Sequence, residues 1–158
     1  MFRKMRREKQ AIPEEECIRI LKEEKRGVLS VIGDDGYPYG TPINHYYSDE
    51  DGRIYFHGGK VGHKVDAMRA CDKVSYCVYD SGEHVGDDWA LTFKCVIVFG
   101  RMEFIENPEE IARLSRLLSE KFTDDQAYID GEIKGYLAAT LMYALTPEHM
   151  TGKRVHEA

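Results

Sequence analysis

The segment best suited to chemistry spans residues 58–64 and has the sequence GGKVGHK. Its glycines let backbone N–H groups approach a ligand closely, and Lys60, His63 and Lys64 add side chains that can carry positive charge. Residues 65–70 have the pattern of a short helix, and a helix N-terminus attracts anions. The segment is therefore a candidate phosphate site, although a sulfate would fit it equally and a solvated loop has the same composition. The Walker spacing is absent, so a P-loop nucleotidase is not indicated.

Other residue types offer weaker chemistry. His45, His57 and His63 are close in the sequence, but their spacing matches no common zinc signature, so no metal site is expected. A haem ligand needs only one residue, and His45 or His57 could serve. The chain has no G-x-S-x-G elbow of a serine hydrolase, and none of its four cysteines stands next to an evident base.

Length and charge limit the class of protein. A chain of 158 residues is expected to form one domain with an ordinary core, and a net charge of −6 argues against a dedicated nucleic-acid binder. The chain has no long apolar run, no secretory signal and no C-x-x-C pair, so we expect a cytoplasmic protein with free thiols and no membrane association. Residues 1–11 form a basic arm, which is expected to be solvated or to contact a partner subunit.

Three short strands are predicted around the candidate site, at 28–32, 37–47 and 54–57. Two glycine-containing turns, at 34–36 and 49–52, join them, because glycine accepts the positive φ of a tight turn. Consecutive strands with tight turns favour an antiparallel barrel or sandwich over a doubly wound sheet, which would need a helix after each strand.

The rest of the chain adds further strands and helices. Pro13 opens one amphipathic helix, and Asn107 caps another with Pro108 at its first position. Segment 89–106 is rich in strand formers and is expected to bend near Gly100 or to divide there. Further predicted elements are a strand at 73–79, a polar loop at 80–88, a helix at 124–137, a strand at 141–145 and a polar tail at 152–158. Together they predict a mainly β protein, with six or so antiparallel strands in a β-barrel with flanking helices.

Two motifs in this chain resemble a known family. They are DGYPYGTPINHYY at 35–47 and YFHGGKVGHKVD at 55–66. Both resemble the FMN-binding split-barrel proteins, and within them the pyridoxamine 5′-phosphate oxidase-like branch that holds the nitroimidazole-resistance proteins. CVIVFGRME and EHMTGK follow in the order of that family. The resemblance implies a single split β-barrel domain over residues 1–158, a homodimer, and FMN in a cleft between the subunits.

The resemblance also implies site residues, position by position. Lys64 and His63 match the basic positions that hold the FMN phosphate. His63 is further implied to position substrate or to donate a proton beside the flavin ring, with a purely phosphate-binding role as the alternative. The other implied cofactor-binding positions are Thr41, Pro42, Ile43 and Asn44 along the isoalloxazine ring, Phe56, His57 and Gly58 along the ribityl chain, and Cys95, where the family often has a polar residue.

The implied function is that of an FMN-dependent oxidoreductase, which passes reducing equivalents from NAD(P)H to a small acceptor such as a nitroaromatic compound. Two alternatives stay open: a flavin-binding or redox-sensing protein without turnover, and a haem-binding protein on the same barrel. FAD or a deazaflavin could replace FMN, because each presents a phosphate. The C-terminal TGKRVHEA lacks the tryptophan with which pyridoxamine phosphate oxidases hold their substrate, so oxidation of pyridoxamine phosphate is not expected.

Overall fold

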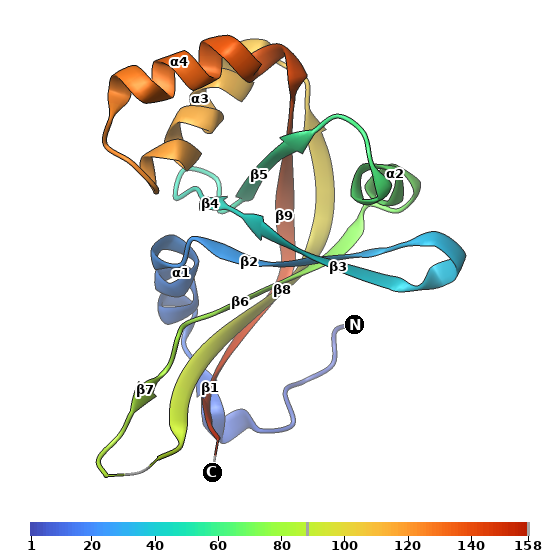
Figure 1. Ribbon diagram of the computed structural model, residues 1–158. Helices are drawn as coiled ribbons and strands as arrows, with labels where there is room; N and C mark the ends of the chain where they lie inside the picture. Colours follow the sequence, from blue (N-terminus) through green and yellow to red (C-terminus); the bar gives the residue numbers. More distant parts are fainter. Residues whose placement is uncertain (88, 158) are drawn as a thin grey trace.

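The computed structural model describes residues 1–87 and 89–157. Within these residues a nine-stranded antiparallel sheet curls around the core, and four α-helices flank it (Figure 1). The strands are β1 (Ala11–Ile12), β2 (Arg26–Ile32), β3 (Pro38–Asn44), β4 (Tyr46–Tyr47), β5 (Ile54–Gly59), β6 (Lys73–Tyr79), β7 (Glu83–His84), β8 (Leu91–Ile105) and β9 (Thr140–His156). The helices are α1 (Glu14–Glu23), α2 (His63–Ala70), α3 (Pro108–Glu120) and α4 (Gln126–Tyr136). The predicted mainly β split barrel with flanking helices is confirmed.

The order of the strands shows where the barrel is split. It runs β3-β2-β6-β8-β9-β5-β4, with β1 added to β9 and β7 to β8. Among the described residues, β3 has no strand partner on the side away from β2, and residues 56–59 of β5 pair only with β9. β3 and β5 still approach one another closely enough to bring Cα atoms within 8 Å. The split therefore lies between these two strands.

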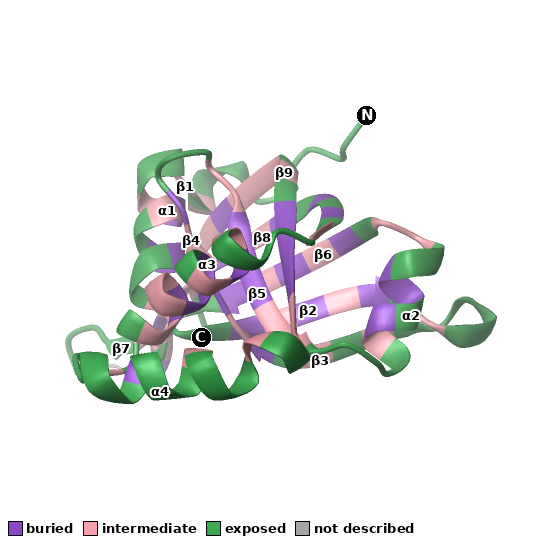
Figure 2. Cartoon of the chain, turned by 90° about the horizontal axis from the view of Figure 1, so that it is seen from above, coloured by how far each residue is buried: buried purple, intermediate pink, exposed green. Residues whose placement is uncertain are grey.

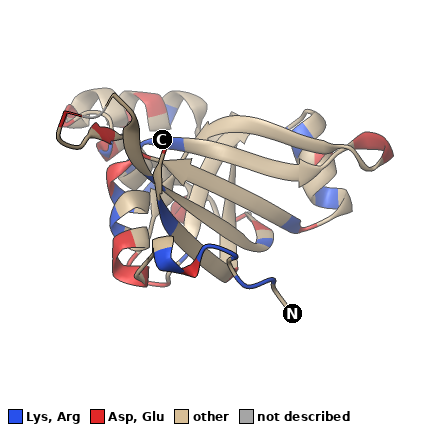
Figure 3. Cartoon of the chain, turned by 90° about the horizontal axis from the view of Figure 1, so that it is seen from below, with Lys and Arg blue, Asp and Glu red and all other residues tan. Residues whose placement is uncertain are grey.

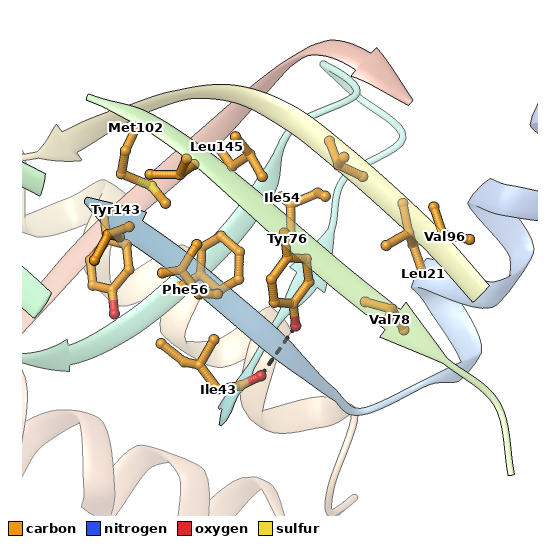
Figure 4. Packing of buried hydrophobic residues seen from close by; sticks show 14 of the residues in the cluster. Leu21, Ile43, Ile54, Phe56, Tyr76, Val78, Val96, Met102, Tyr143 and Leu145 are labelled. Carbon is orange, nitrogen blue, oxygen red and sulfur yellow. Dashed lines mark hydrogen bonds between the residues drawn. The ribbon is translucent and has the colours of Figure 1, made fainter. Parts of the chain in front are cut away.

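The barrel interior is built on three fully buried aromatic side chains, Phe56, Tyr76 and Tyr143 (Figure 4). The Phe56 ring stacks on Tyr143 with centroids 5.7 Å apart, and it meets Tyr76 edge-on at 4.9 Å. Successive side chains of a strand point to opposite faces, so all three rings come from inward positions of their strands. Their contacts set how β5, β6 and β9 pack against one another.

A polar network is buried beside these rings. His45, which separates β3 from β4, donates from Nε2 to the carbonyl oxygen of Leu21 at 2.6 Å. Its Nδ1 accepts from the Tyr76 hydroxyl at 2.8 Å, and that hydroxyl also contacts the Ile43 carbonyl oxygen at 3.1 Å (Figure 4). Both ring nitrogens of this fully buried histidine are engaged, so the sequence-based alternative of His45 as a haem ligand is wrong.

The buried histidine makes stability depend on pH. Burial, reinforced by the positive charge of Lys121, lowers the pKa of His45 from its ordinary 6.5 to about 3. Between these values the unfolded chain binds a proton that the folded protein does not, so stability falls as the pH falls. We expect the free energy of unfolding to drop by roughly 2 kcal/mol between about pH 6.5 and pH 5.

Urea unfolding at these two pH values measures that loss, and a His45→Gln variant is the control because glutamine does not titrate. The variant should lose most of the pH dependence. An unfolding midpoint of the wild-type protein that stays constant over this interval would contradict the expectation.

The two C-terminal helices are held to different extents. The side chain of Asn107 accepts from two backbone N–H groups of the first turn of α3, at 2.9 and 3.1 Å, which confirms the predicted cap. Ile111 and Leu114 of α3 then pack against residues of β5 and β9. In α4, by contrast, Ile129 is the only buried residue among those described, and most of the helix surface is exposed (Figure 2).

Two glycines weaken α4, and their replacement should stabilise the protein. A Cβ on Gly131 or Gly135 would meet no atom within 4 Å, and neither residue has a positive φ. Glycine inside a helix costs about 0.5–1 kcal/mol relative to alanine. A Gly131→Ala, Gly135→Ala double variant should therefore gain about 1–2 kcal/mol in free energy of unfolding. Thermal and urea unfolding test this, and a lowered midpoint would show that α4 depends on these glycines in another way.

Strand β9 is the largest departure from the sequence-based expectation. The sequence predicts a strand at 141–145 and a polar tail at 152–158, whereas β9 runs over Thr140–His156. The prediction of a short strand is wrong. Pairing with β8, from Ile105↔Met142 to Thr92↔His156, keeps residues 146–156 extended although their sequence has little strand propensity. β8 is a single strand through Gly100, and the pairing with β9 shifts register there: Phe99 pairs with His149 and Gly100 with Pro147, which leaves Glu148 of β9 as the extra residue.

The basic arm is shorter and less free than predicted. Ala11 belongs to β1, which pairs with β9, so the arm ends at Gln10. Phe2 stacks on His149 with ring centroids 4.7 Å apart and on Phe99 at 5.8 Å. The arginines and lysines of the arm stay exposed (Figure 3). The basic side chains of the arm are thus solvated as expected, while the partly exposed Phe2 ring also contacts the sheet.

Two predicted segments are described in part. β7 lies within the predicted polar loop at 80–88, of which residue 88 falls outside the described residues, as does residue 158 of the predicted tail. No helix among the described residues is long and apolar enough to cross a membrane.

Candidate functional site

The candidate phosphate segment lies where β5 ends and α2 begins. Its first two glycines, Gly58 and Gly59, belong to β5 and pair with β9, so the predicted loop is reduced to residues 60–62. The longer loop is wrong because strand pairing overrides the conformational freedom of these glycines. α2 follows directly after Gly62, whose φ of 127° is a conformation that favours glycine.

Lys64 brings an ammonium group to the end of β5. Its Nζ lies 5.7 Å from the centroid of the Tyr143 ring and 3.8 Å from the position that a Cβ on Gly58 would take. Partial burial lowers the pKa of Lys64, and no carboxylate among the described residues pairs with it. A desolvated cation without a counter-charge is costly, so a bound anion would stabilise this arrangement.

The hydroxyl of Tyr143 is the second group at this place. It is buried and has no hydrogen-bond partner among the described residues. A Cβ on Gly58 would lie 3.5 Å from it, so this hydroxyl and the Lys64 ammonium flank the same glycine. Buried hydroxyl groups are normally hydrogen-bonded. An unpaired hydroxyl beside an unpaired ammonium therefore leaves hydrogen-bonding capacity that a ligand oxygen could use.

Backbone N–H groups add further donors. The N–H groups of Val65 and Asp66 bind the carbonyl oxygen of Gly62, at 2.9 and 3.1 Å, while those of His63 and Lys64 find no acceptor among the residues described. A Cβ on Gly62 would meet no atom within 4 Å, so the space above it is open. An ammonium, a hydroxyl and free N–H groups are the donors that suit a phosphate. We call Gly58, Gly62, His63, Lys64 and Tyr143 the anion cradle.

The His63 ring lies against the β2–β3 hairpin. Its centroid is 4.3 Å from that of Tyr39, and its Nε2 accepts from the backbone N–H of Asp34 at 3.4 Å. The Asp34 carboxylate is 3.8 Å from the same nitrogen. A Cβ on Gly33 would stand 2.9 Å from Nε2, so this close approach requires glycine. His63 thus links α2 to β3, whereas Lys64 links α2 to β5.

The other predicted cofactor-binding segments lie on the two sides of the split. Residues 41–44 follow the free edge of β3, and residues 56–58 follow the free edge of β5. The side chains of Ile43 and Phe56 are buried in the core, so only their backbone atoms can reach a ligand. Pro42 is exposed. The structure therefore brings both segments to one place, with the anion cradle at one end.

His57 and Asn44 face a separate hollow, under α3 and α4. They line a cleft of ≈ 430 Å³ to which Ser115 of α3 also contributes. Burial, together with the positive charge of Lys64, lowers the pKa of His57, so its imidazole is neutral at neutral pH. Asn44 is fixed by the Nε–H of Arg26, which donates to its Oδ1 at 2.8 Å.

Sequence reasoning missed two residues of these sites. Tyr143 falls within a predicted apolar strand, and nothing in the sequence separates its hydroxyl from that of any core tyrosine. Ser115 did carry a signal, because it stands four residues after Ile111 and three before Leu118, on the apolar face of α3. A hydroxyl on the apolar face of a helix suggests a polar contact other than packing of the helix.

Cys95 is not brought to the anion cradle within one chain. It pairs with Tyr79 and Lys153, at the end of β8 away from Ile105, which pairs with Met142. The ten residues between positions 95 and 105 correspond to roughly 33 Å along a strand. Burial raises the pKa of the Cys95 thiol. Within one chain, Cys95 therefore lies far along β8 from the residues that pair beside Tyr143.

Comparison with known proteins finds likeness in solved structures, while no curated protein sequence matches. A candidate 5-nitroimidazole antibiotic resistance protein from Bacteroides thetaiotaomicron is 21% identical, with a TM-score of 0.78 over 92% of this chain and 87% of that one. A conserved hypothetical protein from Mycobacterium tuberculosis is 20% identical, with a TM-score of 0.79 over 95% and 90%. An FAD-binding protein from Mesorhizobium loti is 23% identical, with a TM-score of 0.71 over 92% and 97%.

At these identities the structural likeness shows the fold alone. The family is shown by the sequence, because the family model described as pyridoxamine 5′-phosphate oxidase matches residues 13–154. That match runs from the start of α1 nearly to the end of β9, and it includes both sides of the split and the anion cradle. The chain therefore belongs to the pyridoxamine 5′-phosphate oxidase family.

Proposed function

We propose that the protein is a flavin-dependent oxidoreductase, a homodimer that holds FMN with its phosphate in the anion cradle. It would take reducing equivalents from NAD(P)H and pass them to a small acceptor, for which nitroaromatic compounds are the first candidates. The observation that carries the proposal is the partly buried Lys64 ammonium, which has no carboxylate partner among the described residues and lies beside the unpaired Tyr143 hydroxyl.

The residues present fit the cofactor. Lys64, Tyr143 and the free N–H groups at the start of α2 would bind the phosphate, and residues 41–44 and 56–58 would orient the rest of the molecule along the split. When bound, the flavin supplies the electron transfer, which no side chain can provide. The FAD-binding relative and the candidate nitroimidazole-resistance relative support a flavin and a nitroaromatic acceptor. We propose FMN and not FAD as the flavin. We also propose that the protein is cytoplasmic, because its four cysteines are free thiols.

His63 is proposed to act at the rim of the same site. Its ring contacts Tyr39 and the backbone of Asp34, which fixes its orientation, while its backbone N–H belongs to the cradle. It would position substrate or deliver a proton there. A His63→Ala protein that binds FMN normally and reduces a nitroaromatic compound at the wild-type rate would remove this role.

An absorbance spectrum of the freshly purified protein tests the proposal, with the mass of any released cofactor. We expect the bands of oxidised flavin and the mass of FMN, followed by bleaching on addition of NADH or NADPH. A protein that takes up neither FMN nor FAD when they are added would overturn the proposal, and a Soret band would replace it with haem. Flavin that stays oxidised in the presence of both nicotinamides would reduce the function to flavin binding.

A further inference from the structure

The cleft under α3 and α4 adjoins the proposed cofactor site, because Asn44 and His57 belong to the two strand segments of the split and also line this cleft. It measures ≈ 430 Å³, within the range of small-molecule sites. Its floor is formed by His57 and Asn44, and α3 and α4 form its walls. It is separate from the anion cradle, because neither Lys64 nor Tyr143 lines it.

Ser115 marks this cleft as a binding site. The residue is 7% exposed, and its Oγ is buried without a hydrogen-bond partner among the residues described. A serine on the apolar face of a helix usually bonds to the backbone or to water, so the unpaired Ser115 hydroxyl has hydrogen-bonding capacity that a ligand reaching this wall of the cleft could use. His57 and Asn44 offer further hydrogen-bonding groups on the floor of the cleft.

The rest of the lining is aromatic and carries almost no charge. Phe122, Tyr128 and Tyr136 stand around the cleft, and each is at least 40% exposed although large and apolar. Of the described residues that line the cleft, Glu132 alone carries a formal charge, and His57 is kept neutral by burial and by Lys64 behind it. Exposed rings favour stacking with a planar ligand, and the single carboxylate disfavours an anion.

The cleft is also next to the proposed redox site. His57 and Gly58 are neighbours in β5, with the side chain of His57 on the cleft side and Gly58 in the anion cradle. The Lys64 Nζ lies 3.8 Å from the position that a Cβ on Gly58 would take, next to His57 in the chain, and its charge lowers the pKa of His57. A molecule in the cleft would therefore be adjacent to a cofactor bound along the split.

We propose that the α3–α4 cleft binds the substrate of the reductase, an uncharged planar aromatic molecule with a polar group that pairs with the Ser115 hydroxyl. This inference rests on the proposed function, since it names the substrate class of that activity. α4 would admit the molecule, because Ile129 is its only buried residue among those described and its hydrogen bonds with Arg116 of α3 are exposed.

Titration of the isotope-labelled, FMN-saturated protein with 4-nitrobenzyl alcohol, followed by NMR, tests the proposal. We expect saturable shifts in β5, α3 and α4. A Ser119→Phe variant fills the cleft and should weaken binding at least tenfold, whereas Glu120→Phe adds the same ring to an exposed position of the same helix and should stay within about twofold. Ser115→Ala should weaken binding about fivefold, the effect of one lost hydrogen bond.

Each other outcome overturns the inference. Shifts elsewhere, or binding unchanged in Ser119→Phe, would exclude the cleft while leaving FMN binding and the proposed function intact. Equal binding of 4-nitrobenzoate would exclude the preference for an uncharged ligand. Competition between the probe and FMN would make the cleft part of the flavin site. Probe binding to a protein that takes up no flavin would overturn the substrate assignment together with the proposed function.

Discussion

A Lys64→Met variant should lose most of its affinity for FMN while keeping its fold. The substitution removes the ammonium that we place on the phosphate and keeps the apolar contact with the Tyr143 ring. A hydrogen bond to a charged group contributes about 1.5–3 kcal/mol. FMN should therefore bind roughly 10- to 100-fold more weakly, as measured by quenching of flavin fluorescence on titration with protein.

Riboflavin and a second lysine supply the controls. Riboflavin lacks the phosphate, so its affinity should be the same in the wild-type protein and in Lys64→Met. Lys73→Met removes an exposed charge at the start of β6 and should leave FMN binding within about twofold. Equal losses for FMN and riboflavin would show that Lys64 supports the site in general and that the phosphate lies elsewhere.

The same variant should be at least as stable as the wild-type protein without cofactor. Partial burial lowers the pKa of Lys64, which means that the folded state disfavours the charged form. Removing that charge relieves the cost, so the unfolding midpoint of the apo-protein should not fall. If a substitution stabilises the protein but weakens ligand binding, the original residue serves ligand binding and not the stability of the fold.

A Phe56→Ala variant should lose about 3–5 kcal/mol in free energy of unfolding. Phe56 is fully buried, stacks on Tyr143 and meets Tyr76 edge-on, so its removal leaves a cavity at the centre of the barrel. Urea unfolding measures the loss. Val61→Ala, at a side chain exposed in the neighbouring loop, is the control and should change stability by less than about 0.5 kcal/mol.

The outcome separates two roles for Phe56. The sequence resemblance places this residue along the ribityl chain, whereas the structure leaves only its backbone free to reach a ligand. If the side chain touched the cofactor, Phe56→Ala would weaken FMN binding with little loss of stability. We expect the reverse, with the folded fraction of the variant binding FMN nearly as well as the wild-type protein does.

Local signals in the sequence predict several elements correctly. The alternation of Lys73–Tyr79 and the cap at Asn107 each depend on neighbouring residues, and both are found in the structure. The mainly β class follows from the same kind of evidence, because short strands joined by tight turns need no distant information.

The features that the sequence does not predict depend on distant partners. The C-terminal half of β9 is a strand only because β8 lies beside it, and Gly58 and Gly59 are strand residues only because β9 pairs with them. Similarly, the unpaired Tyr143 hydroxyl gains its meaning from Lys64, which is far away in the sequence. The spacing of residues along the sequence does not predict such long-range contacts.

The position of β9 between β8 and β5 has a consequence for synthesis on the ribosome. β5 ends at Gly59, yet its long partner begins at Thr140, so about eighty residues must be translated before β5 can pair over its full length. During that interval the nascent chain exposes the apolar segment of β5, and neighbouring nascent chains can pair with it instead. β9 completes the sheet that positions the cradle, so the site cannot form before this strand has been translated.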